Sequence, residues 1–423
     1  MKKAVYSVLF SVGLILNSCG SSSSSSTDNS TQEDLPVVKV EKIFSSLDAY
    51  AALKSDGSVV TWGSDVGSDT SGVDLTNVEE IFTTQRAFAA LKNDGSVVTW
   101  GGFSTGYSNY GENSSGVDLN NVETIFSNDG VFAALKDNDS LVTWGASELG
   151  AGKELADIKE VFSTASAFAA IKNDGEVVTW GASGGESSDV DLSDVDTIFS
   201  NDYAFAALKN DGRVVSWGLS ESGGNSDGLD LTNVNKVFSM DLCFAALKND
   251  KTVVTWGSAC STSLDLKDIE TIFSSTGAFA ALKVDGSVLT WGLEGTGSDS
   301  SDVNLTDVVK IFSTDVAFAA LKADNTVVTW GDPLRGGDSS NVDLTDVKTI
   351  YSNASAFIAL KNDGSAVTWG ASYAGGDSSG LDLNDIATVY SNFSSFAAVK
   401  NDGSVVTWGD QENGGDSSNV NFK

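Results

Sequence analysis

The sequence predicts an all-β protein, a β-propeller of ten short blades that close into one ring. Three observations predict this fold: a tryptophan that recurs at a nearly constant spacing, a hairpin signal ahead of each tryptophan, and chain ends that continue one another. All ten Trp residues are followed by Gly, and successive Trp residues lie 35 to 44 residues apart. A residue fixed at intervals of about 20–50 residues is the signature of solenoids, propellers and repeat arrays.

The first segment, residues 1–19, is typical of an export signal. Two lysines precede an apolar run, residues 4–16, that is too short to span a membrane. The run ends in Leu-Asn-Ser-Cys, which resembles the lipobox of bacterial lipoproteins, in which the cysteine, here Cys19, becomes the lipidated first residue. The Asn departs from the small or aliphatic residue usual at its position. A plain cleaved secretion signal is the alternative.

The Ser-rich residues 20–35 are predicted to form a flexible tether, and residues 36–423 the ten-repeat propeller. A lipid on Cys19 would anchor the protein in a bacterial cell envelope, at the outer membrane. The lipid is then the only membrane contact that we expect, because the rest of the chain holds no apolar stretch long enough for a transmembrane helix.

One repeat, residues 78–101, shows how each blade is built. It contains three β-prone runs, residues 80–83, 87–92 and 96–100. Between the second and third runs lies Asn-Asp-Gly, a strong hairpin signal, because the Gly supplies the positive φ that the turn needs.

The hairpin signal recurs in the other repeats with few changes. Gly holds the last position in seven repeats, and Asp139, Lys251 and Asn325 take its place in the other three. Asp and Asn tolerate the left-handed region better than most residues. The Asp that precedes the Gly is therefore interpreted as turn chemistry and not as a catalytic residue.

The second run lacks the alternation of a half-buried strand. Phe88 to Leu91 are four consecutive apolar residues, so both faces of the hairpin must be covered. Small sheets that pack face to face around an axis provide this cover, which is the β-propeller arrangement. The Ala89-Ala90 pair is expected at a crowded place near that axis.

The repeated string x-L-x-N/D-V-x-x-I-F-S-x-x-x-A-F-A-A-L-K-x-D-G-x-V-x-T-W-G resembles repeats of the regulator of chromosome condensation family. It is most similar to the compact bacterial variant with three-stranded blades, known from a secreted β-lactamase inhibitor. The resemblance covers residues 36–423 and implies a β-propeller. Such propellers usually have seven blades, and their repeats often carry His, which this chain lacks. Neither nucleotide exchange nor β-lactamase inhibition is carried over, because fold does not determine function.

The chain ends predict how the repeats close. Residues 417–422 match residues 339–344, which lead into the first run of a repeat, and residues 36–44 begin with such a run. The C-terminus therefore stops where the N-terminus starts, and neither end resembles the polar cap that a solenoid requires. A single ring is favoured; two five-bladed rings and an open arc are the alternatives.

Cys243 and Cys260 lie in one repeat and are predicted to form a disulfide. Hairpin pairing places Cys243 opposite Gly257 or Ser258, close to Cys260, and an exported protein meets oxidising conditions. Two unpaired thiols are the alternative.

Enzymatic chemistry receives little support. The absence of His excludes His-based triads and His-ligated metals. Asp338, Asp377 and Asp416 in the loops suggest calcium binding, but their spacing matches no defined calcium loop and favours solvated turns. A carboxylate enzyme needs two acids in opposed environments, and nothing distinguishes a pair among 58 acidic residues. We therefore assign no catalytic residue, metal or cofactor.

The net charge of −33 bears on the partner. Such a field repels nucleic acid and anionic membrane surfaces, so a protein or a glycan is the expected partner of a monomer. Within each repeat the loop after the first run and the segment after Trp-Gly should share one rim. Most of the sequence variation between repeats falls in these two segments. The candidate binding residues lie on the connecting segments of this rim: Phe103, Tyr107, Tyr110, Arg335 and Tyr373.

These candidates could instead cover neighbouring connectors. The expected function is that of an exported, lipid-anchored interaction module. An enzyme that acts on extracellular polysaccharide with carboxylates, or a calcium-dependent adhesion protein, is the alternative.

Overall fold

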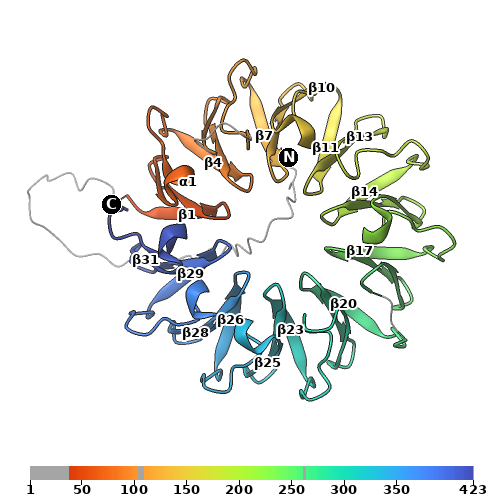
Figure 1. Ribbon diagram of the computed structural model, residues 1–423, viewed down its shortest axis with the longest axis vertical. Helices are drawn as coiled ribbons and strands as arrows, with labels where there is room; N and C mark the ends of the chain where they lie inside the picture. Colours follow the sequence, from red (N-terminus) through yellow and green to blue (C-terminus); the bar gives the residue numbers. More distant parts are fainter. Residues whose placement is uncertain (1–37, 103–108, 261–262, 423) are drawn as a thin grey trace, which may run out of the picture.

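The computed structural model describes residues 38–102, 109–260 and 263–422. Within these residues the chain forms ten antiparallel sheets, each from consecutive strands. The sheets stand side by side around a common axis in one closed ring (Figure 1). The prediction of a ten-bladed propeller in a single ring is confirmed, and the two five-bladed rings and the open arc are excluded. The signal and tether predicted for residues 1–35 lie outside the described residues.

Each blade has three strands in sequence order, and blades are numbered here from 1 to 10 along the chain. The first strands are β1 (Val40–Ser45), β4 (Val78–Thr83), β7 (Val122–Ser127), β11 (Ile158–Ser163), β14 (Val195–Ser200), β17 (Val234–Met240), β20 (Ile269–Ser274), β23 (Val308–Ser313), β26 (Val347–Ser352) and β29 (Ile386–Ser391). The second strands are β2 (Ala49–Lys54), β5 (Ala87–Lys92), β8 (Val131–Lys136), β12 (Ala167–Lys172), β15 (Ala204–Lys209), β18 (Cys243–Lys248), β21 (Ala278–Lys283), β24 (Ala317–Lys322), β27 (Ala356–Lys361) and β30 (Ser395–Lys400). The third strands are β3 (Val59–Gly63), β6 (Val97–Gly101), β9 (Leu141–Gly145), β13 (Val177–Gly181), β16 (Val214–Gly218), β19 (Val253–Gly257), β22 (Val288–Gly292), β25 (Val327–Gly331), β28 (Ala366–Gly370) and β31 (Val405–Gly409).

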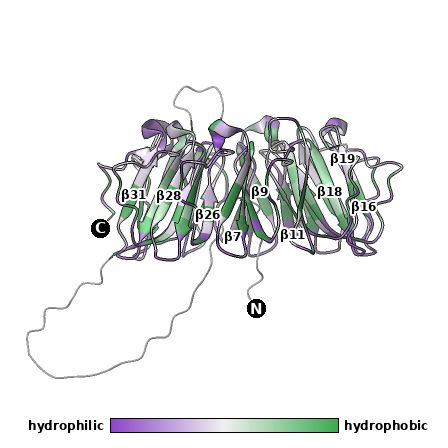
Figure 2. Cartoon of the chain, turned by 90° about the horizontal axis from the view of Figure 1, so that it is seen from below, coloured by the Kyte–Doolittle hydropathy of each residue, from purple (hydrophilic) through white to green (hydrophobic). Residues whose placement is uncertain are grey.

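The remaining elements lie in the connectors between blades. A short strand, β10 (Glu154–Leu155), adds a fourth strand to blade 3. The helical turns are α1 (Asp65–Ser68), η1 (Ser147–Leu149), η2 (Ser220–Ser222), η3 (Pro333–Arg335), η4 (Ser372–Ala374) and η5 (Gln411–Gly415). They follow the third strand of their blade and gather along one edge of the ring (Figure 2). None of the helices in the described ranges has the length and apolar character needed to cross a membrane.

The first strand of each blade lies nearest the axis, where first strands of successive blades contact one another (Figure 1). The second strand is the middle one of its sheet, and successive side chains point to opposite faces. Ala89 and Ala90 therefore face two different neighbouring blades, and both are 0% exposed. The Ala pair was expected at a crowded place near the axis; the place is crowded, but it lies between blades on the middle strand, and the first strand is nearest the axis. The methyl groups allow adjacent blades to approach the middle strand closely.

The core consists of ten apolar clusters, each formed where two blades meet. In one of them Ala87, Ala89 and Leu91 of β5 pack against Phe132 and Trp144 of blade 3. One face of each sheet thus carries mainly small side chains, and the opposite face carries aromatic ones. Because this pattern repeats in every blade, no cap is needed and burial continues around the whole ring.

Hydrogen bonds between neighbouring first strands add a second link around the axis. In seven of the ten blades the Ser hydroxyl near the end of the first strand donates to the backbone carbonyl at the same position of the preceding blade. In this way Ser163 Oγ donates to Ser127 O at 2.8 Å, and Ser45 Oγ of blade 1 donates to Ser391 O of blade 10 at 2.8 Å. The last contact joins segments 346 residues apart and shows that the ring is closed.

The turns between second and third strands form the opposite edge, which we call the turn rim. At the position after the recurring Asp, φ is positive in every blade, including Asp139, Lys251 and Asn325 at 62°, 66° and 64°. The Asp carboxylate completes the turn: Asp94 Oδ1 accepts from the Ser96 amide at 3.0 Å and from its hydroxyl at 2.6 Å. These bonds hold the pKa of Asp94 below its usual range. The assignment of this Asp to turn chemistry agrees with these contacts.

Candidate functional site

Two kinds of segment share the edge opposite the turn rim: the loops between first and second strands, and the first residues after each Trp-Gly pair. We call this edge the variable rim. In seven of the ten blades a buried polar side chain at the start of the loop ties the two segments together. Asn353 Nδ2 donates to Ala374 O at 2.7 Å, and Thr314 Oγ1 donates to Arg335 O at 3.1 Å. The same side chains accept from backbone amides and close the loop, as Asn353 Oδ1 does from Ala356 N at 2.8 Å.

The Gly of each Trp-Gly pair directs the chain onto this rim. Gly331 has a φ of 103°, and a Cβ placed on it would lie 2.6 Å from the carbonyl oxygen of Val316 in the adjacent loop. A side chain is excluded at this position by both conformation and space. The chain can therefore turn sharply beside the loop, and the two segments form one continuous surface.

The Trp of each pair anchors the rim to the preceding blade. Trp369 stacks on Phe357 of its own blade with ring centroids 5.0 Å apart, and its indole N–H donates to Gly336 O in the connector of blade 8 at 3.0 Å. Seven of the ten indoles make this bond. In the described part of the chain, the buried indole N–H groups of Trp100, Trp180 and Trp291 have no hydrogen-bond partner. The connectors that precede these three tryptophans are built differently.

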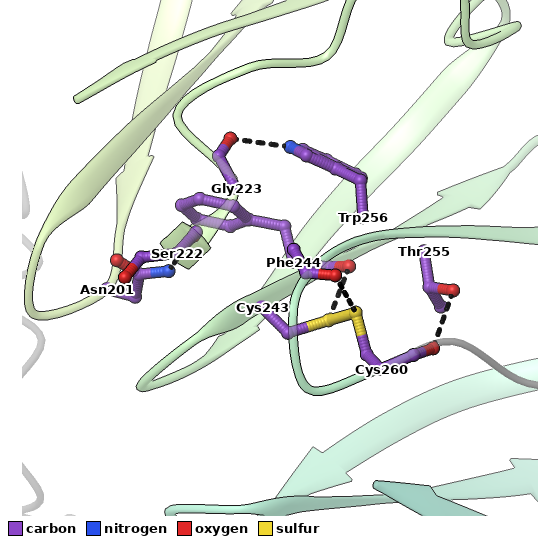
Figure 3. The surroundings of a disulfide bond; sticks show 9 residues. Asn201, Ser222, Gly223, Cys243, Phe244, Thr255, Trp256 and Cys260 are labelled. Carbon is purple, nitrogen blue, oxygen red and sulfur yellow. Dashed lines mark hydrogen bonds between the residues drawn. A yellow bond between two sulfur atoms is a disulfide. The ribbon is translucent and has the colours of Figure 1, made fainter. Parts of the chain in front are cut away.

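One of these connectors, between blades 6 and 7, is held by a disulfide. Cys243 lies opposite Gly257 in the β18–β19 pair and is joined to Cys260, with Cα atoms 6.0 Å apart (Figure 3). At the start of the blade 6 loop, Met240 takes the place of the polar residue that the other nine blades have. Among the described residues no hydrogen bond joins the loop to the connector there, and the disulfide joins the same two segments covalently.

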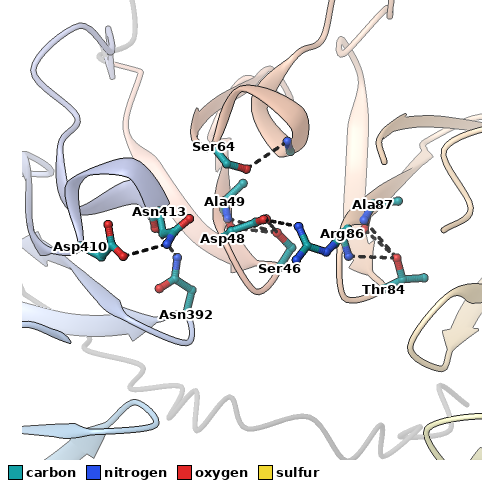
Figure 4. A network of polar contacts seen from close by, with 11 residues as sticks. Ser46, Asp48, Ala49, Ser64, Thr84, Arg86, Ala87, Asn392, Asp410 and Asn413 are labelled. Atoms are coloured by element: carbon teal, nitrogen blue, oxygen red, sulfur yellow. Dashed lines mark hydrogen bonds and ion pairs between the residues drawn. The ribbon is translucent and has the colours of Figure 1, made fainter. Parts of the chain in front are cut away.

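An ion pair connects neighbouring loops of the rim. Arg86 Nη1 lies 2.9 Å from Asp48 Oδ2, which links blade 2 to blade 1 (Figure 4). Both side chains are partly buried, so solvent screens this pair less than a fully exposed one.

The rim carries large apolar side chains that the blades do not cover. Leu334 is 80% exposed, Tyr373 59% and Phe393 55%. Leu334 and Tyr373 hold equivalent places in η3 and η4, on blades 8 and 9, and Phe393 lies in the loop of blade 10. We call these three side chains the apolar arc. Aromatic and large aliphatic residues exposed together on a surface mark sites of interaction.

The predicted binding residues fall into three groups. Arg335 and Tyr373 are exposed on the variable rim, beside or within the apolar arc. Tyr110 is half-buried and its side chain packs against the cluster between blades 2 and 3. Its backbone carbonyl accepts from Thr84 Oγ1 at 2.8 Å. Phe103 and Tyr107, like Cys19, lie outside the described residues.

Leu334 and Phe393 were not among the predicted binding residues. Both occupy positions that vary between repeats, and this variation is the signal that could have identified them. Their exposure depends on the helical turns and loops that lift them from the rim, which the repeat pattern does not show.

Four of the ten loops carry a carboxylate at the same position on this rim. Asp129, Asp202, Asp241 and Asp315 occupy equivalent loop positions around the axis. Burial and the nearby Asp202 carboxylate raise the pKa of Asp129 to about 6. Burial, followed by repulsion from Asp202 and Asp315, raises the pKa of Asp241 to about 6 as well. A cationic group beside these loops would relieve the repulsion.

The loop carboxylates considered for calcium serve as turn caps. Asp338 Oδ1 accepts from Ser340 N at 2.9 Å, Asp377 Oδ1 from Ser379 N at 2.9 Å, and Asp416 Oδ1 from Ser418 N at 2.8 Å. These bonds hold the pKa of each carboxyl below its usual range. Across the described ranges no three His, Cys, Asp or Glu side chains group closely enough to hold a metal ion.

Comparisons with known proteins show similarity of low degree. No family model matches the chain, and no curated protein matches it. Among solved structures it is similar to the CRINKLY WD40 ectodomain of the receptor kinase ACR4 from Arabidopsis thaliana, with 16% identity and a TM-score of 0.36 over 64% of this chain and 99% of that chain. It is also similar to the ectodomain of the receptor kinase CR4 from Physcomitrella patens, with 16% identity and a TM-score of 0.37 over 60% of this chain and 72% of that one.

A third similar structure is Prp20p from Saccharomyces cerevisiae, the yeast RCC1, with 17% identity and a TM-score of 0.31 over 82% of this chain and 75% of that one. One neighbour thus belongs to the family that the repeats resemble. At these TM-scores the similarities carry no argument about partner or activity, and the fold rests on the strands and clusters described above.

Proposed function

We propose that this protein is an interaction module that binds a protein partner through the variable rim. The observation that carries the proposal is the apolar arc: Leu334, Tyr373 and Phe393 are exposed on three adjacent blades, whereas the repeated residues of the strands are buried. Hot spots of protein interfaces consist of a few large side chains of this kind surrounded by polar groups. We further propose that Cys19 carries a lipid and that residues 20–35 tether the ring to an envelope membrane.

Charge defines the chemistry of the partner. The chain carries 58 acidic and 25 basic residues, and Asp315, Asp332 and Glu412 lie on the blades that bear the arc. A partner that combines apolar anchors with Lys or Arg would match both the arc and its surroundings, whereas an acidic partner would be repelled. Complementary charge mainly accelerates association and sets specificity, so binding should weaken as salt rises.

The test is binding of the labelled full-length chain to three arrays: peptides that combine apolar with basic residues, peptides that combine apolar with acidic residues, and glycans. The variant Leu334→Ser/Tyr373→Ser/Phe393→Ser removes the arc. The matched control, Leu229→Ser/Leu381→Ser, removes two exposed leucines outside the rim, near the start of the third strands.

The proposal predicts binding to basic-apolar peptides that falls at least about tenfold in the triple variant, because hot-spot truncations each cost about 1–2 kcal/mol or more. The control should bind as the wild type does. Binding that survives loss of the arc, or binding to glycans alone, would contradict the proposal.

A further inference from the structure

The junction between blade 10 and blade 1 differs from the other nine because the segment after β31 packs against blade 1 but does not continue into β1. Within the described ranges, β1 pairs only inside blade 1 and β31 only inside blade 10, so neither chain end adds a strand to the sheet of the other. The ring therefore closes through contacts between two complete sheets. Elsewhere the chain itself keeps neighbouring blades close, and this reduces the entropy lost when they pack.

Two buried residues depart from the repeat at this junction. Tyr50 takes the position that is Phe in the other nine blades, and Ser395 takes a position that is Ala in seven blades, Val in one and Cys in one. Both are 0% exposed. They belong to facing sheets, β2 and β30, and meet across the closure.

The two departures form one hydrogen-bonded network. The Tyr50 hydroxyl donates to Ser395 O at 2.8 Å and accepts from Asn392 N at 2.9 Å. It lies 3.1 Å from Ser395 Oγ, which lies 2.8 Å from Asn392 Oδ1. Every polar atom added by the two substitutions has a partner, so burial leaves none of them unsatisfied.

The C-terminal segment packs at the same place. Phe422 meets Trp62 edge to face with centroids 5.2 Å apart, and Val420 contacts the cluster that contains Tyr50. Trp62 Nε1 donates to Gly414 O at 3.1 Å, as other tryptophans do across junctions that a connector crosses. In the loop of blade 10, Asn392 lies beside Asn413 of the C-terminal segment, and its Nδ2 donates to Asn413 O (Figure 4).

We propose that Tyr50, Ser395 and Asn392 form a latch that holds the ring closed where the two ends of the chain meet. The network occurs at the one junction that lacks a covalent link and replaces two apolar residues that suffice elsewhere. Without the latch the ring opens first at this junction, and the exposed faces of blades 1 and 10 become available to a second copy of the chain.

The test is hydrogen exchange of the full-length chain, measured blade by blade by mass spectrometry. Tyr50→Phe and, separately, Ser395→Ala each restore the common repeat residue, so both variants should fold. Tyr351→Phe is the matched control, because this half-buried tyrosine lies on β26, in a blade that connectors join on both sides. Exchange measures local opening.

Each latch variant should accelerate exchange in blades 1 and 10 by at least about five- to tenfold, because each removes more than one buried hydrogen bond, and should leave blades 4 to 7 unchanged. The control should leave blades 1 and 10 unchanged. An unaltered profile in both latch variants, or equal acceleration in all blades, would overturn the proposal. Light scattering at high concentration provides a second readout, in which the latch variants and not the control should form dimers.

Discussion

At the scale of single residues, the Trp-Gly pair performs three separate tasks. The Trp ring packs against the Phe or Tyr of the second strand in every blade, with centroids 5.0 to 5.3 Å apart. In seven blades its indole N–H donates to the preceding blade. The Gly that follows turns the chain beside a neighbouring backbone. Both residues of the pair have structural roles. The most conspicuous motif of the sequence therefore identifies no functional site.

The contribution of the indole hydrogen bond to stability can be tested by comparing two tryptophans, one with this bond and one without it. Trp369→Phe removes a bond to Gly336 O, whereas Trp180→Phe removes an N–H group that has no partner among the described residues. Both rings are buried and stack on a Phe, so the loss of packing is similar. Trp369→Phe should lower the free energy of unfolding by about 1 kcal/mol more than Trp180→Phe does.

Chemical denaturation of the two variants side by side measures this difference. Equal losses of stability would show that the bond between blades contributes nothing net.

At the scale of elements, the blades differ mainly in the connectors that follow their third strands. The strands repeat almost without change, but the connector after blade 6 is the shortest. Among the described residues it makes no loop-to-connector hydrogen bond, and the Trp291 indole that follows it has no partner. The disulfide holds this connector against its own blade. The disulfide thus replaces a hydrogen bond that other blades form between loop and connector, which gives it a structural role.

We predict that Cys243 and Cys260 resist alkylation in the unfolded chain until a reductant is added, after which two further thiols react. Replacing both by Ala should lower the free energy of unfolding by about 3 kcal/mol, since the bridge closes a loop of 17 residues. Cys243→Ala introduces the residue most common at this position, so the loss reports the bridge and not a packing defect. Mass spectrometry before and after reduction, with denaturation of the double variant, provides the check. Two thiols that react without reductant would be the contrary result.

At the scale of the whole molecule, the sequence was sufficient to predict blade count, strand order and ring closure. Glycines with an enforced positive φ, tryptophans at constant spacing and matching chain ends are local signals, and each can be recognised without knowing the rest of the structure.

What could not be predicted depends on contacts between distant residues. The Ala89-Ala90 pair was assigned to the axis because the sequence does not show which strand lies innermost. Tyr110 resembled an exposed connector residue, but it packs partly against the neighbouring blade. The latch residues Tyr50 and Ser395 stand out from the repeat in the sequence, yet they lie 345 residues apart and their meaning depends on the closure that brings them together.

The most direct test of the account is electron microscopy of the full-length chain, with particle mass measured in the same sample. If ten repeats close within one chain, class averages seen down the axis will show one ring of ten blades, and the mass will correspond to a single copy of 43.9 kDa. Two smaller rings, an open arc, or a ring formed by two copies would contradict the account, and with it the placement of the apolar arc on three adjacent blades of a single rim.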